Sequence, residues 1–319
     1  MKIGLDVLGG DFAPNATMHG AIMAQKELPS TDKIVLIGNK GDILTFLKEQ
    51  NADPAIFEIV DAPDLIAMDE SPTKALVNKP NSSISTGFRM LKHQEIDSFA
   101  SAGSSGAMLV GAIYSVGNIQ GIIRPSSPAY IAKENGGMSI LIDVGTNPDA
   151  KPDVMYQFGL LGSMFAEHVY HIKNPRVGLL NIGSEEKKGS LTTQSAFQLM
   201  KESKDYTFIG NVEGRELFRD NVDVIVCDGF VGNIVLKQIE AMYRVFVKRG
   251  IKDAYLDRFN YEIYGGTPIL GVNGNVIVGH GISNSTAIKN MILLSRQISE
   301  ANLPARIKHV LEQYTINNI

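Results

Sequence analysis

A short apolar run that ends in a glycine turn and leads into a helix-period segment occurs five times in this 319-residue chain. These runs are SFASAG, ILIDVG, VGLLNIG, VDVIVCDG and VIVGHG. Alternating strands and helices are typical of a mainly parallel sheet, because parallel neighbours need a crossover connection that is usually a helix. The sequence therefore predicts an α/β fold of three layers, α/β/α, with helices on both faces of the sheet.

The chain is expected to form one domain over residues 1–319, with a division into two lobes left open. Short β-branched runs predict strands at 2–8, 33–37, 57–61, 98–102, 139–144, 176–182, 207–210 and 222–227. Helical periodicity predicts helices at 14–28, 41–50, 82–92, 105–116, 153–171, 191–201, 233–248 and 284–300. Asn273 and Gly274 accept positive φ and predict the turn of a β-hairpin. A helical hairpin is expected near residues 234–260, and a polar loop over 68–85.

The loops that follow the strands are the expected ligand site. Carboxyl ends of parallel strands lie along one edge of a sheet, so the loops after them gather in one crevice. Helix amino termini bring unpaired N–H groups and partial positive charge to the same place, which favours phosphate. No glycine-rich loop ends in Gly-Lys-Ser/Thr, and GLDVLGGD has the wrong spacing for a dinucleotide fingerprint. The sequence thus predicts phosphate binding without the usual nucleotide motifs.

Charge and cysteine content narrow the function classes. The net charge of −4 gives no basic footprint, so no nucleic-acid partner is expected. The single cysteine, Cys227, excludes an intramolecular disulfide and fits a reducing cytoplasm. Because Cys227 ends a strand that reads as buried, we expect it to be a core residue rather than an acyl carrier.

Metal chemistry and membrane insertion are not expected either. His168 and His171 are three residues apart, but no carboxylate–histidine pattern accompanies them, so we expect no metal and no cofactor. The amino terminus lacks the pattern of a signal peptide, and no apolar run is long enough to span a membrane. A cytoplasmic protein is predicted, with membrane contact limited to the periphery of the inner face.

Eight motifs occur in an order that is distinctive. They are GLDVLGGDFAP, APDLIAMDESP, SAGSSGA, LIDVGTNPDAKP, NPRVGLLNIGSEEKKG, FIGNVEGR, VCDGFVGN and YGGTPILGVNG. Over nearly the whole chain they resemble the bacterial acyl-carrier-protein:phosphate acyltransferases, the PlsX family. The chain departs from the family pattern at Ser104 and Ser105, which replace an amide and a threonine, and at Thr146, Ser184 and Val231.

The resemblance implies a fold similar to that of isocitrate dehydrogenases and phosphotransacetylases, and a homodimer. It implies transfer of a fatty acyl group from an acyl-carrier-protein thioester to inorganic phosphate, which gives an acyl phosphate for phospholipid synthesis. Inorganic phosphate and acyl carrier protein are then the expected partners. Association with a membrane glycerol-3-phosphate acyltransferase, which would use the product, is a further expectation.

Such a transfer needs donors for phosphate, countercharges, a donor for the thioester oxyanion and a proton for the departing sulfur. Asp143 and Asp228 are expected to orient donors rather than to attack the thioester. Lys188 is the alternative to Lys187 as the countercharge. The predicted catalytic residues are His280, Asn233 and Lys187. The predicted substrate-binding residues are Gly103, Ser104, Ser105, Gly106, Asn147, Lys151, Asn181, Asn211, Arg215 and Asp228. The four backbone amides of residues 103–106 are expected to bind phosphate, and the asparagines to donate to phosphate or to the thioester carbonyl.

Other functions stay open at this point. A phosphotransacylase that uses a CoA thioester is the main alternative, followed by a decarboxylating dehydrogenase of similar fold. A non-enzymatic module that binds lipid or carrier protein is the alternative from another class. Residues 234–260 combine apolar positions at helical spacing with several basic residues, so they fit a dimer interface, an anionic membrane or an acidic carrier protein.

Overall fold

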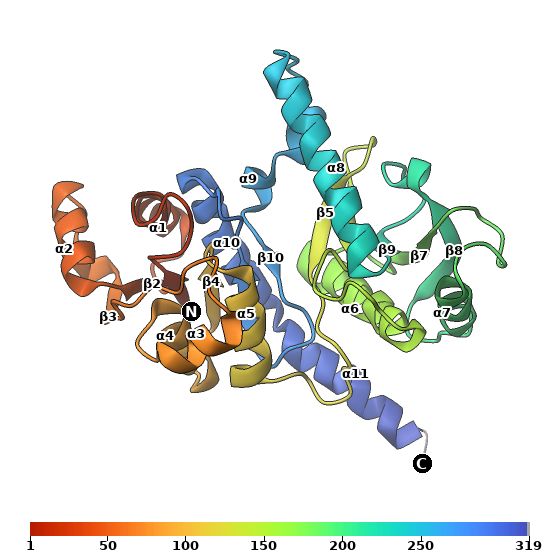
Figure 1. Ribbon diagram of the computed structural model, residues 1–319, viewed down its shortest axis with the longest axis horizontal. Helices are drawn as coiled ribbons and strands as arrows, with labels where there is room; N and C mark the ends of the chain where they lie inside the picture. Colours follow the sequence, from red (N-terminus) through yellow and green to blue (C-terminus); the bar gives the residue numbers. More distant parts are fainter. Residues whose placement is uncertain (318–319) are drawn as a thin grey trace. The chain divides into compact units, whose positions relative to one another are not determined.

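The computed structural model describes residues 1–317, and the side chains of residues 1–312, as two compact units (Figure 1). The first unit comprises Met1–Asn118 and Tyr261–Pro304. The second unit comprises Ile119–Asn260 and the described chain from Ala305 onward. The predicted α/β class is confirmed, but the strands are divided between two mainly parallel sheets, one in each unit.

The sheet of the first unit has the order β10-β11-β4-β1-β2-β3. All neighbours are parallel except β10 and β11, and Leu5 of β1 is in register with Leu36 and with Ala100. The strands are β1 Lys2–Asp6, β2 Lys33–Gly38, β3 Glu58–Asp61, β4 Ser98–Ser101, β10 Thr267–Pro268 and β11 Asn275–Val278.

Helices cover both faces of this first sheet. Along β2, Val35 and Ile37 belong to a buried cluster with α4, so Ile34 and Leu36 point to the opposite face, which α1 and α10 cover. The helices are α1 Asn15–Glu27, α2 Lys40–Glu49, α3 Pro72–Asn78, α4 Ser83–Lys92, α5 Ser105–Gly111, α9 Tyr261–Tyr264 and α10 Ser285–Ala301. A π-helical turn, Ala112–Val116, continues α5.

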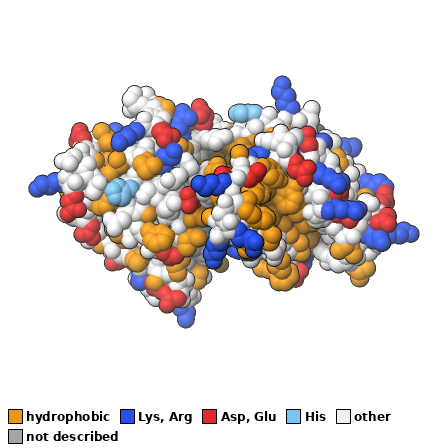
Figure 2. All heavy atoms as spheres, turned by 90° about the horizontal axis from the view of Figure 1, so that it is seen from above, with side chains coloured by type: hydrophobic (Ala, Val, Ile, Leu, Met, Phe, Trp, Pro, Cys, Tyr) orange, Lys and Arg blue, Asp and Glu red, His pale blue; other side chains and the backbone are white. Residues whose placement is uncertain are grey.

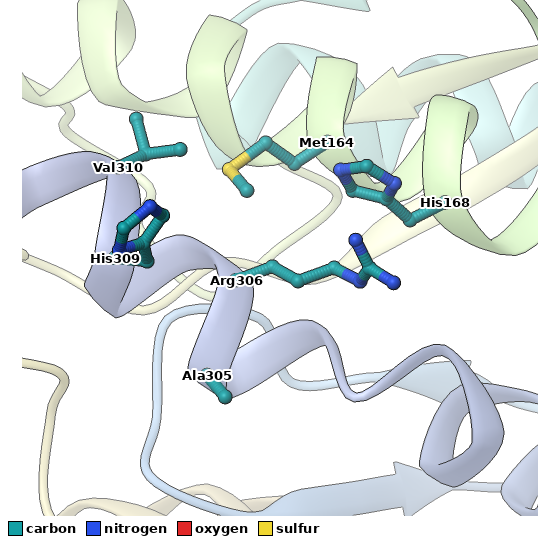
Figure 3. Close-up of a pocket in the computed structure, with 6 residues that line it drawn as sticks. All are labelled: Met164, His168, Ala305, Arg306, His309 and Val310. Atoms are coloured by element: carbon teal, nitrogen blue, oxygen red, sulfur yellow. The ribbon is translucent and has the colours of Figure 1, made fainter.

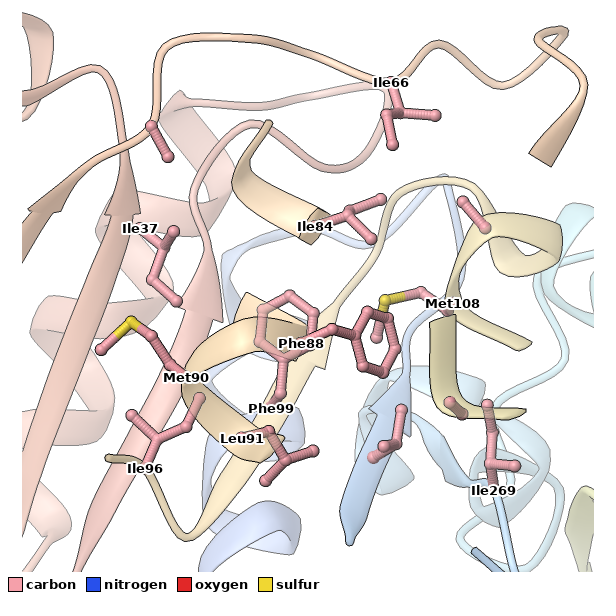
Figure 4. Close-up of a cluster of buried hydrophobic side chains, with 14 of the residues drawn as sticks. Ile37, Ile66, Ile84, Phe88, Met90, Leu91, Ile96, Phe99, Met108 and Ile269 are labelled. Atoms are coloured by element: carbon pink, nitrogen blue, oxygen red, sulfur yellow. The ribbon is translucent and has the colours of Figure 1, made fainter. Parts of the chain in front are cut away.

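Two phenylalanines organise the buried cluster beneath α4 and α5 (Figure 4). The rings of Phe88 and Phe99 lie edge to face with centroids 5.2 Å apart. A Cβ atom on Gly87 would lie 2.2 Å from the Phe99 ring, and a Cβ atom on Gly111 would lie 2.2 Å from the Phe88 ring. Glycine is therefore required at these two helical positions so that the rings can pack against the helix backbone.

The second unit has the sheet order β5-β6-β9-β7-β8, parallel except for the pair β5 and β6. Val224 of β9 packs against Gly162 of α6, whereas the next residue, Ile225, lies in a cluster with Val235 and Ile239 of α8. Helices thus cover both faces of this sheet as well. The strands are β5 Pro128–Ala132, β6 Met138–Ile142, β7 Arg176–Asn181, β8 Thr207–Glu213 and β9 Val224–Val226. The helices are α6 Pro152–Tyr170, α7 Leu191–Lys201, α8 Gly229–Lys248 and α11 Leu303–Asn317.

A buried ion-pair group ties β5, β7 and β9 of the second unit together. Lys133 is only 3% exposed and donates to Asp223 at 2.6 Å and to Asp220 at 3.2 Å. Arg176 donates to Asp223 through Nε at 2.8 Å. Burial raises the pKa of Asp223, but the hydrogen bonds from Arg176 and Lys133 outweigh that effect and lower the pKa to about 2. Asp223 therefore accepts hydrogen bonds from both cations and balances their charge.

The segment after α8 differs from the helical hairpin expected near residues 234–260. The helix runs unbroken to Lys248, and Gly250 then adopts a positive φ of 71°. The following residues form only a short 3-10 helix, Leu256–Phe259, instead of a second α-helix. Tyr255 donates to the carbonyl of Ala132 at 3.1 Å, and Arg258 donates to the carbonyls of Lys133 and Gly137. These bonds anchor the returning segment on the β5–β6 hairpin.

Local details at element ends also depart from expectation. The helix expected from residue 233 begins at Gly229, four residues earlier. The turn before β11 takes its positive φ at Gly271, 89°, rather than at Asn273 or Gly274, and the Asn273 side-chain amide donates to the carbonyls of Gly117 and Asn118. The polar loop expected over 68–85 contains α3. No helix in the described part of the chain is long and apolar enough to cross a membrane.

Candidate functional site

The carboxyl ends of β1, β4 and β11 lie at one edge of the first sheet, because these three strands are parallel neighbours. Two of the five glycine turns, those after β4 and β11, therefore meet at this edge. The amide of Gly279 donates to the carbonyl of Ser101 at 2.8 Å. The amide of Asp11, in the loop after β1, donates to the carbonyl of Gly281 at 2.7 Å. Backbone hydrogen bonds thus lock all three loops of this edge together.

Asp6 lies fully buried beneath these loops and organises them. It accepts from the Ser101 hydroxyl at 2.6 Å and from the Leu8 amide at 3.0 Å. Burial raises the pKa of Asp6, although the hydrogen bond from Ser101 opposes that rise. The Ser101 hydroxyl accepts in turn from the Gly103 amide at 2.9 Å. The amide of Gly103 is therefore used within the turn and is not presented to a ligand.

The two serines of this turn differ in their surroundings. Ser104 is 4% exposed and caps α5 by accepting from the Ala107 amide at 3.3 Å, whereas Ser105 is exposed. Within residues 1–317, the amides of Ser104, Ser105 and Gly106 have no acceptor, as expected for the first turn of a helix. These three amides, rather than the four that the sequence predicts, are the donors that remain for an anion.

His280 lies in the turn after β11 and is half-buried. Its ring lies beside the ring of Tyr261, with centroids 5.2 Å apart. The Tyr261 hydroxyl donates to the carbonyl of Ile282 at 3.0 Å, and the Ser283 amide donates to the carbonyl of His280 at 2.9 Å. The histidine is thus placed on a turn whose backbone is fixed on both sides.

The other three glycine turns lie at the carboxyl edge of the second sheet, after the parallel strands β6, β7 and β9. Asp143, fully buried, accepts from the amides of Ser127, Val144 and Asn147. The Asn147 side chain donates to Asp143 at 3.1 Å and to the Pro125 carbonyl at 2.7 Å. Both N–H groups of that amide are therefore used, and Asn147, 6% exposed, shapes the loop from inside.

The start of α8 packs directly on this loop. The Gly229 amide donates to the carbonyl of Asn147 at 2.8 Å, and Asp228 caps the helix by accepting from the Val231 amide at 2.7 Å. Asn233 is exposed, and a Cβ atom built on Gly145 would lie 3.7 Å from its Cβ atom. Asp228 thus fixes the first turn of α8, and Asn233 is accessible at the same edge.

The predicted cations lie in exposed segments of the second unit. Lys151 immediately precedes α6, and Lys187 lies in the loop between β7 and α7. Lys188 lies 3.9 Å from Glu185, and Arg215 donates to Glu213 at 2.8 Å. Among the described residues, Lys187 and Lys151 make no ion pair within 4.0 Å, whereas Lys188 and Arg215 do.

Cys227 ends β9 in the core and is 4% exposed. Burial raises the pKa of the Cys227 thiol, and the nearby carboxylates Asp228 and Asp143 raise it further. The thiolate that a covalent mechanism would need is disfavoured. The core interpretation from the sequence agrees with this placement.

Sequence reasoning did not find Ser101, although this residue links Asp6 to the Gly103 turn. The available signal was a serine at the end of a fully buried apolar strand, SFAS, where a hydroxyl needs a partner. A buried hydroxyl one strand away from a buried carboxylate is the kind of pair that only tertiary structure brings together.

A cavity of about 320 Å³ in the second unit lies apart from these loops (Figure 3). It lies between α6 and α11, and its lining residues are Met164, His168, Ala305, Arg306, His309 and Val310. Burial lowers the pKa of His168, and Arg306 lowers it further.

Two mainly parallel sheets, each covered by helices on both faces, form an α/β fold that solved phosphotransacetylases share. A phosphotransacetylase from Streptococcus pyogenes has a TM-score of 0.67 at 14% identity, with 93% of this chain and 94% of that chain covered. EutD phosphotransacetylase from Staphylococcus aureus has a TM-score of 0.65 at 14% identity, with 94% of each chain covered. The predicted fold similarity is confirmed.

Sequence comparison identifies the family within this class. A family described as "Fatty acid synthesis protein" matches residues 1–306. The phosphate acyltransferase of Heliobacterium modesticaldum is 42% identical over 328 residues, with 97% of each chain covered. The phosphate acyltransferase of Endomicrobium trichonymphae is 39% identical over 338 residues, with 98% of each chain covered. The chain belongs to the phosphate acyltransferase family of fatty acid synthesis proteins.

Proposed function

We propose that this protein transfers a fatty acyl group from an acyl-carrier-protein thioester to inorganic phosphate and releases acyl phosphate and free carrier thiol. The observation that carries the proposal is family membership over residues 1–306, with relatives named phosphate acyltransferase that match nearly end to end. The loops at the carboxyl edges support it: those of the first sheet present the free amides of residues 104–106, and those of the second sheet present Asn233, Lys151 and Lys187.

The reaction needs little acid–base chemistry from the protein. A phosphate oxygen attacks the thioester carbonyl carbon, the carbonyl oxygen becomes an oxyanion, and the C–S bond breaks. The second ionisation of phosphate lies near neutral pH, so no strong protein base is required. Catalysis therefore depends on holding two electron-rich partners together and on donors aimed at the oxyanion.

Roles are proposed unit by unit. In the first unit, the amides of Ser104, Ser105 and Gly106 bind phosphate, and His280 protonates the departing thiolate. In the second unit, Lys187 is the countercharge for the anionic partners, and Asn233 donates to the developing oxyanion. Lys151 and Arg215 contribute further positive charge, and Asp228 fixes the first turn of α8.

Purified protein incubated with acyl carrier protein thioester and phosphate should give acyl phosphate, trapped as a hydroxamate by hydroxylamine, with one free carrier thiol for each acyl group. Omitting phosphate should abolish thiol release. Replacing the carrier with acyl-CoA tests the CoA-dependent alternative, which predicts equal turnover of that thioester. Thiol release that does not depend on phosphate would contradict the proposed reaction. Full turnover by His280→Ala would show that His280 is not the proton donor.

We also propose that the protein acts as a homodimer. We further propose that it makes peripheral contact with an anionic membrane, where a glycerol-3-phosphate acyltransferase would take up the product.

The membrane proposal is supported by the outer half of α8 and the residues after it, where hydrophobic side chains gather beside basic ones (Figure 2). The exposed residues of this surface are Met242, Val245, Val247, Lys248, Arg249, Ile251 and Lys252. Sedimentation should give the mass of two 34.7 kDa chains.

Neutralising Lys248, Arg249 and Lys252 together, each to glutamine, should weaken binding to anionic vesicles by about 100-fold, since each basic residue near such a surface contributes about 1 kcal/mol. Vesicle sedimentation measures the effect, with zwitterionic vesicles as the reference. The matched control replaces Lys173, Lys201 and Lys204, which are exposed elsewhere on the second unit. Equal loss in both triple variants would mean that net charge, not this surface, governs binding.

A further inference from the structure

Two asparagines on neighbouring strands form a bonded pair beneath the loop that carries Lys187. Asn181 ends β7, and Asn211 lies on the adjacent parallel strand β8. The Asn181 amide donates to the Asn211 side-chain oxygen at 3.0 Å and to the Lys188 carbonyl at 3.1 Å. The Asn211 amide donates to the Glu185 carbonyl at 2.9 Å. The pair therefore holds the 182–190 loop at two points along its backbone.

These bonds use most of the hydrogen-bond donors and acceptors of the two side chains. The Asn181 oxygen accepts from the Ile182 amide at 2.8 Å, so its acceptor and both its N–H groups are engaged. The Asn211 oxygen and one of its N–H groups are engaged as well. This arrangement is that of a loop support, and it differs from the direct donation to substrate that the sequence predicts for both residues.

The loop passes unusually close to this support. Gly189 has a positive φ of 87°, and a Cβ atom built on it would lie 2.4 Å from the Asn181 oxygen. The Lys188 amide donates to the Glu185 carbonyl at 3.0 Å, which closes a turn around Lys187. A side chain at position 189 would break the contact, so this glycine is required for the loop to reach its anchor.

The charges of the loop leave Lys187 as its outward cation. Glu186 pairs with Lys201 at 2.7 Å, and Glu185 lies 3.9 Å from Lys188. Among the described residues Lys187 has no acidic partner, and its side chain is exposed. The supported turn thus displays one exposed lysine that, among the described residues, makes no ion pair within 4.0 Å.

We propose that Asn181 and Asn211 are positioning residues, which hold the 182–190 loop so that Lys187 meets the anionic reactants in a fixed place. The inference rests on the function proposed above. In this role the two asparagines fix the conformation of the loop and do not contact phosphate or thioester.

Trypsin tests the support without any substrate, because cleavage after Lys187 and Lys188 should become faster when the loop loses its anchor. Asn211→Ala should raise the cleavage rate at these bonds about 5- to 10-fold, as expected from the loss of a supporting hydrogen bond. Asn211→Asp, which keeps the acceptor for Asn181 and loses the donor to Glu185, should act in the same direction. Asn135→Ala, an exposed asparagine that supports the β5–β6 turn, is the matched control. Cleavage of both Asn211 variants at the wild-type rate overturns the proposal, and cleavage after Lys133, which is 3% exposed in the folded protein, reports any general unfolding.

A double-mutant cycle tests the link to Lys187. Asn211→Ala should lower kcat about 5- to 10-fold in the wild-type background and less than about twofold in the Lys187→Ala background, with the phosphate KM nearly unchanged. An equal loss in both backgrounds, or a loss confined to the phosphate KM, overturns the proposal. If wild-type protein forms no acyl hydroxamate, the proposed function fails, while the tryptic comparison still decides the role of the asparagines.

Discussion

Gly232→Ala is expected to lower the free energy of unfolding of the second unit by about 4 kcal/mol or more. The added Cβ atom would lie 1.9 Å from the backbone oxygen of Asp143 and 2.9 Å from the sulfur of Cys227. The Asp143 oxygen cannot move away, because it belongs to the backbone and the Asp143 amide is bonded to the Cys227 carbonyl at 3.1 Å. The first turn of α8 must therefore separate from the loop after β6.

Urea unfolding followed by circular dichroism measures this effect, with Gly214→Ala as the matched control. Gly214 lies at the same sheet edge, a Cβ atom there would meet nothing within 4 Å, and its φ is not positive. The control should stay within about 0.5 kcal/mol of the wild type. Equal stability of the two variants would show that α8 does not pack on the Asp143 loop as described.

Asp223→Ala is expected to cost about 3–5 kcal/mol, because it leaves the buried ammonium of Lys133 without its 2.6 Å partner. Asp220→Ala removes another carboxylate from the same two cations, but Asp220 is 56% exposed, so the cost should be below about 1 kcal/mol. Equilibrium unfolding of the two variants gives the comparison. Similar losses for both would contradict the burial of Lys133.

The same group gives a pH dependence with a defined sign. The folded pKa of Asp223, about 2, lies below its ordinary value of 3.8, so its ionisation stabilises the fold above that value and the contribution is lost as pH falls through about 2. The stability difference between the wild type and Asp223→Asn should therefore be constant above about pH 5 and shrink toward pH 2. A difference that grows on acidification would contradict the assigned bonds.

Local sequence pattern predicted most of the elements, because the strands are short, β-branched and followed by glycine turns. It did not predict that two turns would lie on one sheet and three on another, since strand order depends on contacts between distant segments. It also missed β5, whose sequence PAYIA begins with proline and shows no alternation because it is buried along its whole length. Helix α3 was hidden in a polar stretch with little apolar periodicity.

For the candidate residues, too, the sequence predicted the kind of interaction but not the atom that each side chain contacts. Residue type predicted that Asn147, Asn181 and Asn211 would donate hydrogen bonds, and all three do, but to protein carbonyl and side-chain oxygens. Spacing cannot distinguish a donor that faces a ligand from one that supports the loop beneath it. The amide of Gly103 was likewise expected to face phosphate, and only the position of the Ser101 hydroxyl shows that it does not.

The return of the chain from α8 to the β5–β6 hairpin has a practical consequence. Tyr255 and Arg258 fix the end of this excursion, and α8 fixes its beginning, so the stretch around Gly250 is a tethered tip with no part in the sheet. Residues could be inserted or deleted there without moving either anchor. Relatives are therefore expected to differ in length at this tip, and a fluorophore or affinity tag grafted beside Gly250 should leave the core unaltered.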